Sequence, residues 1–176
     1  MVRILRFFAY FSFLIMALIY FSPKNNMYYL LEKELKSESL IVNNELVNDK
    51  GFTLNIKNAT ILTNSILIAE VMNIDFNFFI FYNSININTI TLNEISKSLI
   101  PLNIQKVDIY YSIVNPLNIL LSGEGEFGKF KAKFNMLNQI LDIKLEPSKL
   151  MKSKYKNTLR KFKKSENGEY IYEKTI

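Results

Sequence analysis

The segments KFKAKFN, residues 129–135, and ILDIKLE, residues 140–146, decide the fold. In the first, lysine alternates strictly with apolar residues; in the second, apolar residues alternate with two acids and Lys144. An apolar residue at every second position is typical of a strand with one buried face and one wet face. Residues 137–139 supply a turn. The two segments therefore predict an antiparallel hairpin in which lysines of one strand face acids of the other.

The same period of two extends through most of the chain after residue 39. Turns are predicted at Asp49–Lys50–Gly51, at Asn83–Ser84 and at Asn115–Pro116, because these residue types favour tight bends. The fold class is therefore mainly β: a curled antiparallel sheet or a sandwich. The predicted strands lie within residues 39–48, 52–56, 59–92, 107–113, 117–123, 129–136, 141–146 and 169–173.

A helix is predicted over Lys149–Ser165, opened by Ser148 as N-cap. Met151, Tyr155, Leu159 and Phe162 form one apolar stripe, which we expect to pack on the sheet and leave the basic residues solvated. The alternative is a surface for a partner or for anionic lipid headgroups. The basic residues of that surface would be Lys149, Lys152, Lys156, Arg160 and Lys163.

The N-terminal segment Phe7–Phe21 reads FFAYFSFLIMALIYF and contains no charged residue. Counted from Ile4, about 18 residues are available, close to the length that crosses a bilayer. Arg3 and Arg6 precede the segment, so the excess of positive charge places the N-terminus in the cytoplasm. A cleaved signal peptide is the alternative, but bulky Tyr20 and Phe21 stand where a cleavage site needs small residues.

These segments divide the chain into three parts. Residues 1–22 form the predicted membrane anchor, residues 23–38 a linker containing a short helix, and residues 39–176 an extracytoplasmic β-rich domain. Glu32 and Lys36 support the linker helix as an i, i+4 pair. A domain of this size is large enough for one core.

The composition argues against an enzyme. The 176 residues include no His, Cys or Trp, so the common nucleophile–base pairs and zinc or iron–sulfur sites are unavailable. We expect no catalytic residue, no metal site and no cofactor. The net charge of +6 is concentrated in residues 149–164, and with three arginines in the whole chain we expect no nucleic-acid binding. The abundance of Asn is interpreted as compositional bias.

The predicted strands contain more aromatic and aliphatic residues than one buried face of a narrow sheet can hold. Beyond Phe78, both faces of the predicted strand become apolar through Tyr82. An uncovered face would form a groove for acyl chains or for a partner segment, and the alternative is an ordinary sandwich core. The candidate groove residues are Phe76, Phe78, Ile80, Phe130 and Phe134.

The C-terminal half resembles a known family. Asn115–Pro116–Leu117 between two strands, Gly125–Glu–Phe–Gly128 before the next strand, and Leu145–Glu–Pro–Ser148 after another resemble the type II secretion system protein N family. That family is in turn similar to the AsmA-like lipid-transfer proteins. The resemblance covers residues 99–172 and the layout of the chain.

A second resemblance, in layout alone, is to the lipopolysaccharide-export protein LptC, which pairs one N-terminal span with a curled periplasmic sheet. Both resemblances imply a single-pass protein of the bacterial inner membrane with a periplasmic domain. The first implies a non-enzymatic component of a protein-secretion machine within an envelope complex. The alternative function is lipid or lipopolysaccharide transfer along the apolar groove.

Overall fold

The computed structural model describes residues 2–93, 101, 103–165 and 167–175. Within these residues the chain forms one antiparallel sheet of eleven strands, preceded by two helices and interrupted near its end by two short helices. The elements are α1 Val2–Phe21, α2 Lys24–Ser37, β1 Leu40–Asn43, β2 Leu46–Asp49, β3 Thr53–Thr63, β4 Ile66–Phe78, β5 Tyr82–Leu92, β6 Asn103–Ser112, β7 Asn118–Gly125, β8 Gly128–Asn135, β9 Ile140–Pro147, α3 Lys149–Lys154, α4 Lys156–Leu159, β10 Lys163–Lys164 and β11 Tyr170–Thr175.

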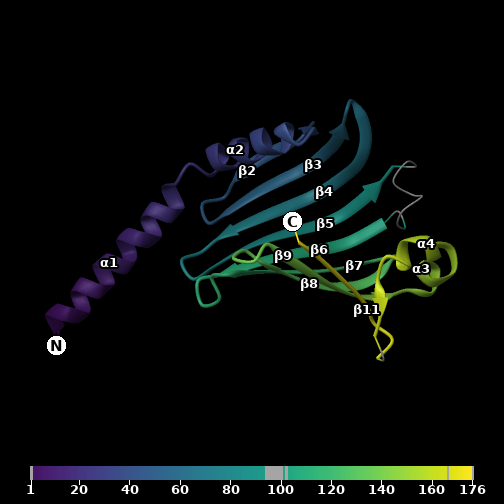
Figure 1. The fold of residues 1–176 in the computed structure, drawn as a ribbon. Coiled ribbons are helices and arrows are strands. Elements are labelled where there is room, and N and C mark those ends of the chain that lie inside the picture. Colours follow the sequence, from purple (N-terminus) through teal and green to yellow (C-terminus); the bar gives the residue numbers. More distant parts are fainter. Residues whose placement is uncertain (1, 94–100, 102, 166, 176) are drawn as a thin grey trace.

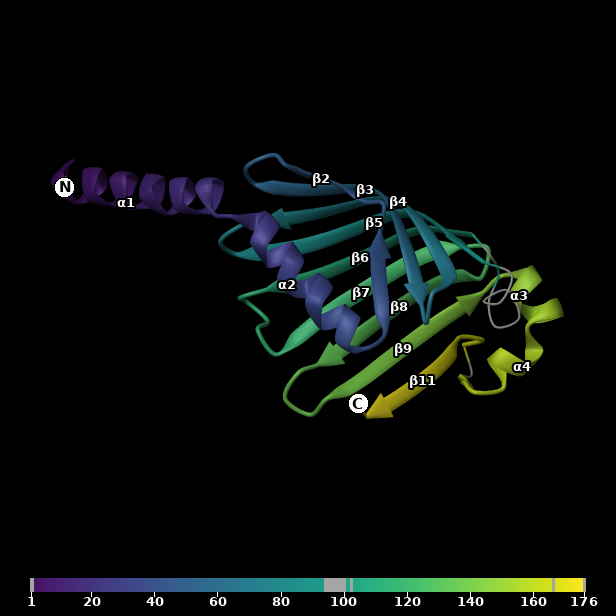
Figure 2. The ribbon, with the colours of Figure 1, turned by 90° about the horizontal axis from the view of Figure 1, so that it is seen from above.

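The strand order is β1-β3-β4-β5-β6-β7-β8-β9-β11-β10, with β2 also paired to β3. The sheet curls but does not close, so the sandwich alternative is wrong and the curled open sheet is confirmed (Figures 1 and 2). In Figure 1, α1 projects from one end of the sheet, which we call the anchor end, and α3 and α4 lie at the opposite, far end.

Two residues with positive φ mark a bend in the longest strands. Asn58 of β3 has φ 56° and Thr89 of β5 has φ 54°, and both lie where the pairing passes over Met72 of β4. Side chains rarely adopt this left-handed conformation in regular strands, and an unpaired residue there bends the strand and increases its twist. These positions help the sheet to curl.

The predicted hairpin of residues 129–146 is confirmed in faces and register. Lys129 is paired with Glu146 and Lys133 with Asp142 as expected, but Lys131 between them is paired with Lys144. The turn at Asp49–Lys50–Gly51 is also confirmed, since β2 and β3 pair on either side of it.

Two local predictions are wrong. Asn83 and Ser84 do not form a turn, because they lie in β5; the turn is Phe79–Phe81, which has no turn-forming residue. Ser84 is buried and its hydroxyl accepts a hydrogen bond from Asn77, which holds the segment in the sheet.

The predicted helix over Lys149–Ser165 is also shorter than expected. Ser148 caps α3 as predicted, with its hydroxyl accepting a bond from the Met151 amide, but the helix breaks at Tyr155 (φ −114°, ψ 37°). The chain then turns after α4, and pairing of Lys163 with Ile171 draws Lys163 into β10.

Candidate functional site

One face of the sheet carries two unbroken rows of paired residues that cross eight strands, and we call it the apolar face. A third, shorter row at the anchor end contains one polar residue, Asn83; its members are Phe78, Asn83, Tyr111, Ile119, Phe134 and Leu141. The first long row is Leu54, Phe76, Ile85, Ile109, Leu121, Ala132, Ile143 and Tyr172, and the second is Ile56, Ile74, Ile87, Val107, Gly123, Phe130, Leu145 and Tyr170.

Within the described residues, helices cover this face only in part. Tyr28 and Leu35 of α2 pack with Leu54 and Ile56 in one core cluster, and α2 lies along β1 and β2 (Figure 2). At the far end, α3 and α4 pack Met151 and Leu159 against Leu145 and its neighbours in a second cluster. The strands between the two clusters, β5 to β8, carry mostly half-buried side chains on this face.

The predicted groove residues are divided between these regions. Phe76 and Phe78 are half-buried, pack beside the α2 cluster and stack with ring centroids 6.5 Å apart. Phe130 belongs beside the far-end cluster, and half-buried Phe134 lies between them on β8. Ile80 is not in a strand: it is 40% exposed in the turn that joins β4 to β5. Four of the five therefore share the apolar face, without forming one contact cluster.

A cavity of about 230 Å³ lies on the apolar face at the far end, and its lining is entirely apolar at the surface. Sheet residues form one wall and α3, α4 and the turn after them form the other. The lining residues are Ile104, Phe127, Phe130, Ile143, Leu145, Met151, Thr158 and Phe162.

Gly123 shapes the wall of this cavity. The Phe130 ring lies across Gly123, its cross-strand partner, and a Cβ on Gly123 would come within 2.5 Å of Phe130 Cε1 and 2.9 Å of the Lys106 carbonyl oxygen. An aromatic ring over a strand glycine is a known way to support such a position. Because the residue at 123 has no side chain, the ring can lie flat at this point of the row.

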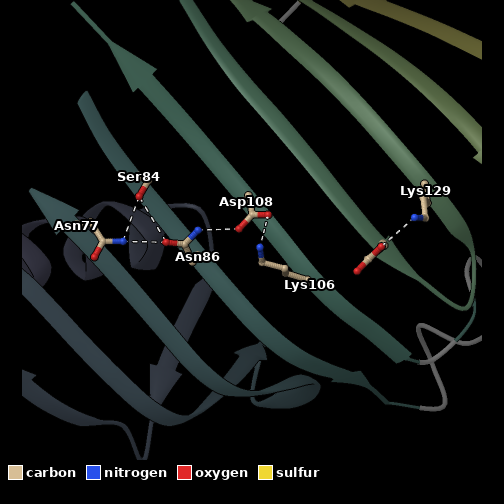
Figure 3. Close-up of polar contacts among 7 residues, drawn as sticks. Asn77, Ser84, Asn86, Lys106, Asp108 and Lys129 are labelled. Atoms are coloured by element: carbon tan, nitrogen blue, oxygen red, sulfur yellow. Dashed lines mark hydrogen bonds and ion pairs between the residues drawn. The ribbon is translucent and has the colours of Figure 1, made fainter. Parts of the chain in front are cut away.

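The opposite face of the sheet is polar and hydrogen-bonded from strand to strand, and we call it the polar face (Figure 3). Asn55 donates to both Asn73 and Asp75 at 2.6 Å. On the neighbouring strands, Asn77 donates to Ser84 and Asn86, and Asn86 donates to Asp108 at 2.6 Å. The Asn residues that sequence analysis attributed to compositional bias thus form a ladder across β3 to β6.

The ladder ends in an ion pair. Lys106 Nζ lies 2.8 Å from Asp108 Oδ2, and Lys129 pairs with Glu124 two strands further on at 3.3 Å. Burial by itself would raise the pKa of the Asp108 carboxyl, but the hydrogen bonds from Lys106 and Asn86 and the charge of Lys106 lower it. The same hydrogen bond and charge raise the pKa of Lys106.

A buried lysine joins α1 to the sheet. Lys24 is 1% exposed, and its Nζ donates to the carbonyl oxygens of Tyr20 and Ser22, each at 3.1 Å. Nζ also lies 3.7 Å from Asp49 of β2, whose carboxylate accepts the Gly51 amide. Lys24 Nζ therefore caps the Tyr20 carbonyl near the end of α1, shares the Ser22 carbonyl with its own backbone amide, and lies beside Asp49 of the β2–β3 hairpin. The sequence did not predict this role, because a lysine next to a membrane span is ordinarily interpreted as a charge that flanks the span.

The basic residues predicted as a surface are all exposed. Lys149 and Lys152 lie on α3, Lys156 on α4, Arg160 just after it, and Lys163 on β10. The apolar stripe packs on the sheet as expected, with Met151 2% and Leu159 5% exposed. The group lies at the far end, away from α1 (Figure 1).

α1 is long and apolar enough to cross a membrane, with a mean hydropathy of 2.0 over its best window and none of that window buried. It is the one such helix in the described part of the chain, and a signal sequence would share these properties. Among the residues that the structure describes, no three acidic side chains gather as metal ligands. Comparison of the chain with protein-family models, curated proteins and solved structures found no match.

Proposed function

We propose that this protein is a membrane-anchored, non-enzymatic lipid-binding protein that holds acyl chains on the apolar face of its open sheet. One observation carries the proposal: two unbroken apolar rows cross eight strands of a sheet that does not close. Exposed apolar surface is unfavourable by about 25 cal/mol per Å², so a face this wide favours a bound apolar ligand. The apolar far-end cavity extends the same surface.

The proposal includes a location. α1 spans the inner membrane with its N-terminus in the cytoplasm, and the sheet lies in the periplasm. The arginines before α1 support this orientation through the positive-inside bias. The resemblance to the AsmA-like proteins and to LptC supports both the compartment and the lipid ligand.

A second candidate is a component of an envelope secretion complex, as the resemblance to the type II secretion protein N family implies. The observation that favours it is the far-end basic surface, where residues 149–164 carry eight basic residues and no acid. Such a surface suits an acidic protein partner. In this second candidate function, the apolar face would bind a protein segment and not a lipid.

Photo-crosslinking in cells separates the two candidates. Benzoylphenylalanine replaces Phe130, which lines the far-end cavity, and in a matched variant replaces Lys131, the next residue on β8 and exposed on the polar face. Phe78 is unsuitable because it lies beside α1, where bilayer lipid would react.

We expect lipid adducts from position 130 and none from position 131. Protein adducts from position 130 without lipid would refute lipid binding and favour the secretion component. Equal lipid labelling at both positions would show that the apolar face has no preference for lipid.

A further inference from the structure

Eight exposed apolar residues of the β-domain lie in three loops at the anchor end. These are the β4–β5 turn, the β6–β7 loop and the β8–β9 loop, and we call them together the rim. Its exposed apolar residues are Phe79 (40%), Ile80 (40%), Phe81 (65%), Ile113 (49%), Val114 (86%), Leu117 (49%), Met136 (38%) and Leu137 (71%). None of the three loops contains a charged residue.

Backbone hydrogen bonds join the three loops into one edge. The Ile113 amide donates to the Phe81 carbonyl at 3.1 Å, and the Met136 amide donates to the Leu117 carbonyl at 2.9 Å. The loops are therefore side by side and present their apolar side chains as a continuous band. The far end differs, because α3, α4 and β10 place basic residues there.

The rim reaches the last turns of α1. Phe78 and Phe79 line a cleft whose other wall is Ile15, Leu18 and Ile19 of α1. Aromatic rings continue the contact: Tyr20 meets Phe52 edge to face at 5.5 Å, and Phe52 stacks on Phe79 at 6.2 Å. The β4–β5 turn of the rim thus lies beside α1 residues that are part of the apolar span.

We propose that the rim inserts into the outer leaflet of the membrane that α1 crosses, so that the apolar face opens directly onto bilayer lipid. This inference rests on the proposed span and on the proposed lipid binding, and it names the source of the lipid. Ile15 to Phe21 rise about 9 Å along the helix axis, which matches the about 5–10 Å to which interfacial apolar segments enter a bilayer.

Three features of the rim agree with this occupant. Uncharged loops cost little to desolvate, whereas the basic far end would be expensive to insert. Tyr20, Phe52, Phe79 and Tyr82 form a chain of rings at the height where membrane proteins place their aromatic belts. The short row of the apolar face, from Phe78 to Leu141, begins directly behind the rim.

Tryptophan fluorescence tests the proposal, because the chain contains no Trp and a single introduced Trp reports one position. The full chain is reconstituted in phosphatidylcholine vesicles with and without brominated acyl chains. The rim variants are Val114→Trp and Leu137→Trp. The matched control is Ile66→Trp, 48% exposed at the far-end start of β4, and Phe11→Trp within α1 reports the span.

We expect blue-shifted emission and quenching by brominated lipid for both rim variants and for Phe11→Trp, but not for Ile66→Trp. Rim emission no more quenched than that of Ile66→Trp overturns the proposal. If Phe11→Trp is also unquenched, the proposed span fails with it. Quenching at the rim without a lipid adduct at position 130 would support insertion of the rim. The same result would refute lipid binding on the apolar face.

Discussion

The contacts of Lys24 predict the outcome of a specific substitution. Lys24→Met keeps the apolar stem of the side chain but removes the donor to the Tyr20 and Ser22 carbonyl oxygens. The Tyr20 carbonyl loses its capping partner and the Ser22 carbonyl keeps only the backbone amide of residue 24. Asp49 keeps the Gly51 amide and is 30% exposed, so it is not left as a buried unpaired charge. The loss therefore falls on the end of α1.

The magnitude follows from these bonds. A hydrogen bond to a charged group contributes about 1.5–3 kcal/mol, and Lys24 makes two. Because the Ser22 carbonyl keeps a backbone donor and water or headgroups reach the Tyr20 carbonyl, we expect a loss of about 2–4 kcal/mol in the joint where Lys24 holds the end of α1 beside the β2–β3 hairpin. At 1.4 kcal/mol per tenfold change, opening of this contact increases by roughly 30-fold to several hundred-fold.

Hydrogen–deuterium exchange of the detergent-solubilised chain, measured by mass spectrometry, reads this opening in the peptides of β2, β3 and the start of α2. Asp49→Asn is the matched variant: it keeps an acceptor for the Gly51 amide and removes only the 3.7 Å ion pair, while the Lys24 ammonium keeps its two carbonyl acceptors. We expect much faster exchange in Lys24→Met than in Asp49→Asn. Equal effects would refute capping as the main role of Lys24, and unchanged exchange in Lys24→Met would refute the joint itself.

Three further substitutions probe the sheet. Ile56→Ala empties a fully buried site and should lower the free energy of unfolding by about 2–5 kcal/mol, measured by chemical denaturation. Gly123→Ala should destabilise by about 1–3 kcal/mol through its clash with Phe130, and Phe130→Ala in the same chain should recover part of that loss. Asp108→Asn should cost no more than about 1 kcal/mol, because Lys106 is largely exposed. Because the pKa of Asp108 is lowered, the ion pair stabilises the fold above about pH 4, and this stabilisation is lost as the pH falls through the folded-state pKa of Asp108. Because the pKa of Lys106 is raised, the ion pair persists up to about pH 10. The difference between wild type and Asp108→Asn should therefore shrink toward pH 3.

Alternation in the sequence predicted the faces of the sheet well, because a side chain's face in a strand depends only on its position modulo two. Lys129 and Phe130 needed no further information to be placed on opposite faces. The register of β8 and β9 followed from the short turn between them. Alternation did not predict whether the sheet closes, because the strand order and the bend near Asn58 and Thr89 depend on pairing between residues far apart in the sequence.

The errors in the candidate site have a common cause, which is that tertiary contacts override local preference. Asn83 and Ser84 favour a turn in isolation, but hydrogen bonds from neighbouring strands hold their segment in β5. Phe79–Phe81 carries no turn signal, and its position at the rim is visible only when three loops are brought together. The buried position of Lys24 likewise depends on Asp49, 25 positions further along the chain.

The short helices α3 and α4 make the two ends of the apolar face unequal. At the far end Met151 and Leu159 cover the apolar face around Leu145 of β9, whereas at the other end the strands finish in the rim. Under the proposed function, an acyl chain lying along β8 and β9 would enter from the rim, because α3 and α4 cover the far end of these strands. An acyl chain would be released either backward into the bilayer or sideways over an edge strand, and a receiving carrier would have to collect it there. The rate of delivery would then depend on that carrier's arrival, and the domain itself would set only how long the chain is held.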